Sequence, residues 1–378
     1  MIIKVINVLE KEFISFGYTK NEYDEIRNSY SLLKYSEETL LVKFKEIISF
    51  FIELGYTNEE IIKMSKVFSS IYSYSIDNMK QKIADIIALG YTKEEVLKMT
   101  KKLPAIYGLS IESMKQKIAD IIELGYTKEE VLKMTKVLPA LYGSSIESMR
   151  QKIADVIELG YTKEEVIKMS KSFPSIYSHS IDNMKQKIAD IIELGYTKEE
   201  VLRMTKTLPT IYGHSIESMK QKIADIIALG YTKEEVLKMT KKLPAIYSYS
   251  IDNMKQKIAD IIELGYTKEE VLRMTKISPS IYGHSIENLK QKVEFYDSIN
   301  MHSLAVKSPN QLMQSVVLSY ARYQFYLSKG ITVDMENYRK LFIGNKEFEK
   351  AHGITKEELL EKYPYEAYLE VKKNGRTV

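Results

Sequence analysis

Apolar positions recur along most of the chain at the three- and four-residue spacing that is typical of amphipathic helices. Within residues 93–103, one helix face would carry a mostly apolar set of side chains: Val96, Leu97, Met99, Thr100 and Leu103. Residues 111–124 repeat the pattern with a second apolar set: Ile111, Met114, Ile118, Ile121 and Ile122. Because neither helix can bury its apolar face alone, the pattern predicts pairs of helices that stack in layers.

Capping and turn residues mark the ends of both predicted helices. Thr92 precedes the first helix, and Glu95 three positions later completes a capping box of the form T-x-x-E. Pro104 disfavours helix at the residue before it, which predicts a turn or a short 3-10 segment after the first helix. Ser110 then caps the second helix, and Gly125 follows its end.

This pair of helices recurs with a fixed period. The string GYTKEEV begins at Gly90 and returns every 35 residues up to Gly265, and the altered copy GYTNEEI begins at Gly55. Weaker copies open at Gly17, Gly330 and Gly353. The sequence therefore predicts an all-α helical-repeat solenoid, a superhelix of two-helix units with a Pro-led turn between the helices. We expect N-terminal degenerate repeats over 1–54, seven near-identical repeats over 55–299, and C-terminal degenerate repeats over 300–378.

The order of motifs within each unit carries a family resemblance. Residues 89–96, Leu-Gly-Tyr-Thr-Lys-Glu-Glu-Val, are followed by Leu103-Pro104 and by Ser110 through Lys117. This order resembles the repeats of the mitochondrial transcription termination factor (mTERF) family. Three later stretches resemble that family's terminal repeat: Lys307-Ser308-Pro309, Ala321-Arg322-Tyr323 and Tyr326-Leu327. The resemblance implies a curved α-helical superhelix with a basic groove that binds double-stranded nucleic acid, in some members RNA, without catalysis.

The amino-acid composition excludes several kinds of site chemistry. The 378 residues include 55 Lys or Arg and 51 Asp or Glu, and this net charge of only +4 does not by itself indicate nucleic acid. The absence of cysteine excludes disulfides, thiolate zinc sites and a Cys nucleophile. Paired glutamates such as Glu94-Glu95 recur in every unit, so we interpret them as helix-start residues and not as a catalytic pair. With few histidines and no recognised catalytic motif, we expect no enzymatic activity, no metal and no cofactor.

Membrane and targeting signals are also missing from the sequence. No apolar run approaches the roughly 18–20 residues that a membrane span needs. The first residues lack the basic segment of a secretory signal and are too acidic for a mitochondrial presequence. We expect a soluble, intracellular monomer with no membrane partner, in a compartment that the sequence leaves open.

Two sets of cations recur in the predicted first helix of each unit. One Lys near the end of that helix is constant: Lys66, Lys101, Lys136, Lys171, Lys206, Lys241 and Lys276. A Lys or Arg three positions earlier forms the second set: Lys63, Lys98, Lys133, Lys168, Arg203, Lys238 and Arg273. Along a superhelix both sets would form basic rows, which is the electrostatic signature of phosphate binding. The alternative is structural, because cations favour helix C-termini and Glu94 with Lys98 is a stabilising i,i+4 pair.

Two positions vary between otherwise near-identical units, and they are candidate sequence readers. The first variable position ends the first helix: Val67, Lys102, Val137, Ser172, Thr207, Lys242 and Ile277. The second variable position lies seven residues further on: Tyr74, Leu109, Ser144, His179, His214, Tyr249 and His284. A variable residue flanked by constant cations would suit bases flanked by phosphates. The alternative is drift at exposed helix ends, where most substitutions are nearly neutral.

Tyr107 and its equivalents, from Tyr72 to Tyr282, are constant after the proline position. An aromatic ring at a constant position can stack on a base or pack in the core, and here we favour core packing.

The leading hypothesis for the whole chain is a nucleic-acid-binding solenoid, with duplex DNA preferred over RNA. The alternative is a protein-binding scaffold, including one delivered to a host, since solenoid grooves commonly bind protein partners and the net charge is modest. A continuous positive groove would favour the first hypothesis, and an alternating or apolar groove the second.

Overall fold

The computed structural model describes residues 8–373, and within this range the chain is all-α with no strand. It divides into two compact units, residues 1–186 and 187–378, which are described separately. The division falls inside one helix, α11 (Ile181–Glu193), in the middle of the repeat array. The expected three-part division at residues 54 and 299 stays a prediction.

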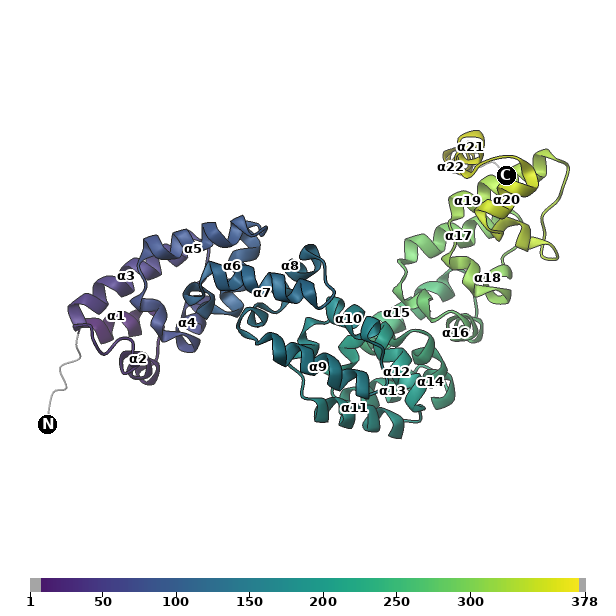
Figure 1. Ribbon diagram of the computed structural model, residues 1–378. Coiled ribbons are helices and arrows are strands. Elements are labelled where there is room, and N and C mark those ends of the chain that lie inside the picture. Colours follow the sequence, from purple (N-terminus) through teal and green to yellow (C-terminus); the bar gives the residue numbers. More distant parts are fainter. Residues whose placement is uncertain (1–7, 374–378) are drawn as a thin grey trace. The chain divides into compact units, whose positions relative to one another are not determined.

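The first unit consists of α-helices, which Figure 1 labels, with a short 3-10 segment after α4 and after every second helix from there. Before α11 its elements are, in order, α1 (Val8–Phe16), α2 (Lys20–Arg27), α3 (Glu37–Glu53), α4 (Asn58–Val67), η1 (Ser69–Ser73), α5 (Ile76–Ala88), α6 (Lys93–Lys102), η2 (Pro104–Gly108), α7 (Ile111–Glu123), α8 (Lys128–Val137), η3 (Pro139–Gly143), α9 (Ile146–Glu158), α10 (Lys163–Ser172) and η4 (Pro174–Tyr177). Each first helix of a repeat contacts the first helix of the next, as α4, α6, α8 and α10 do in turn. The second helices α5, α7 and α9 contact one another in the same way.

The second unit continues the pattern and then becomes less regular. After α11 its elements are α12 (Lys198–Thr207), η5 (Pro209–Gly213), α13 (Ile216–Ala228), α14 (Lys233–Lys242), η6 (Pro244–Ser248), α15 (Ile251–Glu263), α16 (Lys268–Ile277), η7 (Pro279–Gly283), α17 (Ile286–Ser298), α18 (Leu304–Lys307), η8 (Pro309–Met313), α19 (Val316–Ser328), η9 (Tyr338–Phe342), α20 (Asn345–His352), α21 (Lys356–Lys362) and α22 (Tyr365–Lys373). The predicted fold class, an all-α helical-repeat solenoid with a Pro-led 3-10 segment in each unit, is confirmed.

Local sequence signals account for the ends of these helices. The Glu95 N–H donates to Thr92 Oγ1 (3.2 Å), and the Thr92 N–H donates to Glu95 Oε2 (2.9 Å), so both halves of the predicted capping box are formed. The Ser113 N–H donates to Ser110 Oγ (3.0 Å), which confirms the cap of the second helix. Gly125 has a φ of +116°, a backbone conformation that suits glycine and ends α7.

The core lies between the two helices of a repeat and those of its neighbours. Val96, Met99, Met114 and Ile121 are at most 1% exposed, as their helical spacing predicts. The expectation for Ile122 was wrong, because its side chain is 38% exposed. One residue along an α-helix is a rotation of about 100°, so a side chain directly after the buried Ile121 turns away from the core.

Buried tyrosines join several repeats to the next. The Tyr91 hydroxyl, which precedes α6, bonds to Thr135 Oγ1 in α8 (2.6 Å) and to the Tyr142 hydroxyl in η3. Equivalent trios are Tyr18 with Ser65 and Tyr72, Tyr126 with Ser170 and Tyr177, Tyr196 with Thr240 and Tyr247, and Tyr231 with Thr275 and Tyr282. Core packing, expected for the tyrosine after the proline position, is therefore confirmed.

The N-terminal segment behaves as a further repeat. Thr19 and Glu22 form a capping box at the start of α2, and Tyr18 makes the same hydroxyl contacts as Tyr91. At the C-terminal end, Thr355 and Glu358 form another capping box at α21. The weak sequence copies at Gly17 and Gly353 therefore correspond to real copies of the first helix.

Candidate nucleic-acid interface

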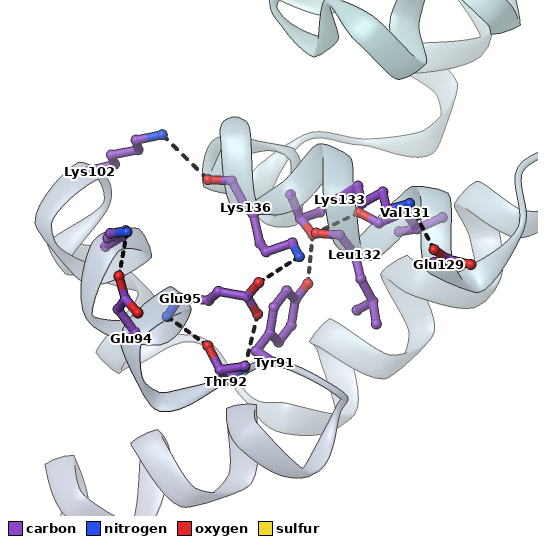
Figure 2. A network of polar contacts seen from close by, with 12 residues as sticks. Tyr91, Thr92, Glu94, Glu95, Lys102, Glu129, Val131, Leu132, Lys133 and Lys136 are labelled. Atoms are coloured by element: carbon purple, nitrogen blue, oxygen red, sulfur yellow. Dashed lines mark hydrogen bonds and ion pairs between the residues drawn. The ribbon is translucent and has the colours of Figure 1, made fainter. Parts of the chain in front are cut away.

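Most of the constant lysines near the ends of the first helices make an ion pair with the preceding repeat. Lys136 Nζ in α8 lies 2.7 Å from Oε1 of Glu95 in α6, the capping glutamate (Figure 2). In the first unit the same pairing joins Lys66 to Glu22, Lys101 to Glu60 and Lys171 to Glu130, and in the second unit Lys241 to Glu200 and Lys276 to Glu235, over 2.5–2.8 Å. Sequence reasoning identified the lysines and the capping glutamates separately but missed their pairing.

The capping glutamates in these pairs therefore serve two partners with their two oxygens. Glu95 Oε2 accepts the Thr92 N–H that starts its own helix, while Oε1 faces Lys136 of the next repeat. The Lys136 ammonium, and after it the Thr92 N–H, lowers the pKa of Glu95 below its ordinary value. At the N-terminal end the same arrangement, with Lys66 as the main cause, lowers the pKa of Glu22 to about 2. The glutamate is thus held ionised by contacts from two repeats.

The second set of cations lies on a more exposed part of the same helices. Lys98 pairs with Glu94 (2.6 Å) and Lys133 with Glu129 (2.7 Å), which confirms the i,i+4 pair expected from the sequence. Their side chains are 67% and 63% exposed, against 31% for Lys136. The remaining members are also exposed: Lys63, Lys168, Arg203, Lys238 and Arg273. These cations are therefore open to a ligand in solution.

The first variable position is exposed in every repeat: Val67, Lys102, Val137, Ser172, Thr207, Lys242 and Ile277. Lys102 reaches to the end of the next first helix, where its Nζ donates to the carbonyl oxygens of Val137 (3.1 Å) and Lys136 (3.4 Å). In the second unit Lys242 donates to the carbonyl oxygen of Ile277 (3.2 Å). The first variable position and the cation sets therefore meet at the ends of the first helices.

Each unit contains a basic groove at these helix ends. The groove of the first unit has a volume of about 410 Å³ and is lined by Glu95, Lys98, Lys101, Lys102 and Lys136. The groove of the second unit has a volume of about 490 Å³ and is lined by Glu200, Arg203, Glu235, Lys238, Lys241, Lys242 and Lys276. Both grooves thus bring together the two predicted cation sets, the first variable position and the capping glutamates. Cations outnumber carboxylates in each.

The family model that describes mTERF proteins matches the chain twice, over residues 86–193 and over residues 190–349. The protein belongs to the mTERF family. Membership indicates a nucleic-acid-binding helical-repeat protein, which agrees with grooves that are rich in Lys and Arg. A search of curated proteins finds no match to this mTERF chain.

The second variable position has different surroundings in this mTERF protein. Its backbone carbonyl accepts a hydrogen bond from a lysine in the second helix of the preceding repeat, as Lys152 Nζ donates to His179 (2.6 Å) and Lys257 Nζ to His284 (2.7 Å). The side chains are half-buried at all seven places: Tyr74, Leu109, Ser144, His179, His214, Tyr249 and His284. Burial lowers the pKa of the three histidines, and nearby lysines add to this effect, which favours the neutral imidazole.

These half-buried side chains also meet the next repeat. A Cβ atom added at Gly108 would lie 2.6 Å from the Tyr74 hydroxyl oxygen, and one at Gly283 would lie 2.8 Å from that of Tyr249. His214 Nε2 lies 3.4 Å from Ser248 Oγ at the equivalent place. Of the described residues that line the two grooves, none is at the second variable position. Packing between repeats therefore gives a physical reason for part of its variation.

Among residues 8–373, no group of His, Asp and Glu side chains is arranged to hold a metal ion. No helix in that range combines the length and the apolar character that crossing a membrane requires. The two basic grooves are the candidate sites for a ligand.

Proposed function

We propose that this protein binds double-stranded nucleic acid without catalysis, with duplex DNA preferred over RNA, through the C-terminal ends of its first helices. The two basic grooves carry this proposal. A duplex presents closely spaced phosphates, and each one neutralised by Lys or Arg releases bound counterions. Both cation sets are the proposed phosphate contacts, because they line the grooves together.

The ion pairs of the constant lysines are compatible with this role. A lysine ammonium has three N–H donors, and the pair with a capping glutamate uses one of them. Lys101 and Lys136 remain about a third exposed within their pairs. A phosphate oxygen that approaches from the groove can therefore accept a second hydrogen bond from the same ammonium.

The variable positions remain candidate readers in this proposal. The first variable position lies among the proposed phosphate contacts, which is where a base-reading side chain needs to be. The second variable position is half-buried against the next repeat, so a reading role there requires a side chain that contacts both the repeat and the ligand. A selection of bound sequences from a random duplex library would show whether either position selects bases.

Salt-dependent binding tests the proposal directly. A fluorescent duplex DNA of about 30 base pairs is titrated with the full chain between 50 and 200 mM salt, alongside duplex RNA and single-stranded DNA of equal length. We expect the tightest binding to duplex DNA, with the logarithm of the affinity falling by about 0.9 per phosphate contact for each unit of log salt. Binding that is absent at 50 mM salt, or independent of salt, would contradict the proposal.

One observation favours a second function. Glu95, Glu200 and Glu235 stand among the cations, so each groove carries both signs of charge. Such a surface also suits a protein segment of mixed charge, as a scaffold would bind. Failure of every nucleic acid in the titration would favour this scaffold.

A further inference from the structure

We infer that the first variable position determines where phosphate docks, because Lys102 in the first unit and Lys242 in the second each complete one discrete phosphate-docking groove. The inference rests on the proposed function, since it assumes a nucleic-acid ligand. It changes the role of the first variable position: this position sets local charge and does not read bases. The duplex is then held most strongly at the two repeats that carry this lysine.

The charge partners within the first groove support this assignment. Lys101 faces Glu60, Lys136 faces Glu95 and Lys98 faces Glu94, each at 2.6–2.7 Å. Lys102 makes hydrogen bonds to carbonyl oxygens, and none of its described contacts is with a carboxylate. Lys102 therefore brings the positive charge that this groove has in excess.

The second groove has the same design. Lys241 faces Glu200 and Lys276 faces Glu235, while Lys242 faces the Ile277 carbonyl oxygen. Arg203 and Lys238 also line this groove, and both are exposed. Two units that pack separately thus contain a basic groove at the repeats that carry Lys at the first variable position.

A neighbouring repeat shows what is missing when this lysine is absent. The third repeat keeps Lys133 and Lys136, and Lys171 follows in the fourth repeat; each of these lysines pairs with a glutamate. At its first variable position stands Val137, which is 54% exposed. The repeats therefore differ at this place mainly by one uncompensated charge, and phosphate contacts respond to charge without carrying sequence information.

The position of the ammonium suits a phosphate. Lys102 Nζ lies at the C-terminal end of α8, where the free carbonyl groups and the helix dipole attract a cation. Carbonyl oxygens carry no formal charge, so the ammonium keeps a net positive charge for an anion, although the helix dipole offsets part of it. Because the side chain is already held in the groove, a phosphate oxygen can bind it with little further loss of side-chain entropy.

A matched pair of double variants tests the inference in the full chain. K102S/K242S removes both lysines and introduces a residue that the fourth repeat carries naturally at this position, Ser172. The control, K93S/K233S, removes two exposed lysines from the starts of the first helices of the same repeats. The probe is the same 30-base-pair duplex DNA. We expect the salt slope of K102S/K242S to fall by about 1.8, so that raising salt from 50 to 200 mM costs the wild type roughly tenfold more affinity than this variant.

The gain of a lysine gives the converse test. V137K places an ammonium beside Lys133, Lys136 and Lys171, and it should steepen the salt slope by about 0.9. In the random duplex library all sequences should be weakened alike by K102S/K242S. Equal slopes for K102S/K242S and its control, an unchanged slope for V137K, or an altered base preference would each overturn the inference while duplex binding by the wild type stands. If the wild type fails to bind duplex DNA, the proposed function itself falls.

Discussion

Glu95 and Lys136 are 41 residues apart in the sequence, yet Glu95 Oε1 and Lys136 Nζ lie within 2.7 Å of each other. The same carboxylate caps the helix that contains Glu95, so one side chain fixes both a helix start and the packing of the next repeat. Within each unit this link recurs from repeat to repeat. The stability of the array should therefore depend on the ionisation of its capping glutamates.

Acid should destabilise the protein through these glutamates. Their pKa values are lowered in the folded state, to about 2 for Glu22, and the ordinary value is 4.5. A lowered folded-state pKa contributes stability that is complete above the ordinary value and is lost as the pH falls towards the folded value. We expect the free energy of unfolding, measured by urea titration and circular dichroism, to fall between about pH 5 and pH 2. The variant E95Q should show a weaker fall, and a flat profile for the wild type would contradict the prediction.

The capping threonines should each contribute to stability. Replacing Thr92 with Ala removes the acceptor of the Glu95 N–H and should lower the free energy of unfolding by about 1 kcal/mol. Thr210→Ala is the control, because Thr210 is exposed after its proline and Ala occupies the equivalent position at Ala105. The free energies of unfolding of both variants are measured by denaturant titration and compared. Equal stabilities would mean that the cap is not used in solution.

The buried tyrosine links should also be measurable. Tyr91→Phe keeps the ring but removes the bonds to Thr135 and Tyr142, which leaves buried hydroxyl groups short of a partner. The expected loss is roughly 1–3 kcal/mol of unfolding free energy. Tyr30→Phe serves as the control, since Tyr30 is 93% exposed. A loss for Tyr91→Phe no larger than that of the control would show that the hydroxyl bonds add no stability.

Alkaline pH should act on the same tyrosines. Burial raises the pKa of Tyr56 to about 12 and raises that of Tyr91 as well, from an ordinary value of 10.0. A raised folded-state pKa means that stability is complete below the ordinary value and is lost as the pH rises through the folded value. We expect tyrosinate absorbance to show two groups, with the buried group ionising only as helicity disappears. A single titration of all tyrosines near pH 10 with helicity intact would disagree with the structure.

The contact between Tyr74 and Gly108 should make two equivalent glycines respond differently. Gly143→Ala has free space around the added Cβ and should raise stability by about 0.4–1 kcal/mol through a less flexible unfolded chain. Gly108→Ala places its Cβ 2.6 Å from the Tyr74 hydroxyl oxygen and should lose that gain or become destabilising. Adding Tyr74→Ser to the Gly108→Ala variant should restore the gain in stability. Thermal unfolding of the three variants would reveal the difference, and identical shifts for Gly108→Ala and Gly143→Ala would exclude the contact.

Local features of the fold could be predicted from the sequence because their signals lie within a few residues. The capping box of Thr92 and Glu95, the cap at Ser110 and the 3-10 segment after Pro104 all depend on neighbours in the chain. The 35-residue period then predicted the stacking. Ile122 was placed wrongly because apolar spacing does not show where the buried face ends.

The candidate site was predicted only in part, because its main contacts join different repeats. The sequence identifies Lys136 as constant and Glu95 as a cap, but every constant residue has the same 35-residue period, so constancy cannot show which pairs meet. For the same reason the contact of Tyr74 with Gly108 was not expected. The signal that could have revealed the ion pair is the constancy of both partners together with their opposite charge.

The trio of Tyr91, Thr135 and Tyr142 has a consequence for changes in the length of the chain. Because the next joint, formed by Tyr126, uses equivalent donors and acceptors, excising residues 125–159 would carry Ser170 and Tyr177 to the places that Thr135 and Tyr142 now occupy. Tyr126 already bonds to Ser170 and Tyr177 in this way, and Glu95 would meet Lys171 as its new partner. The array is therefore tolerant of gaining or losing whole modules, whereas an indel of any other size would break the joint at which it falls.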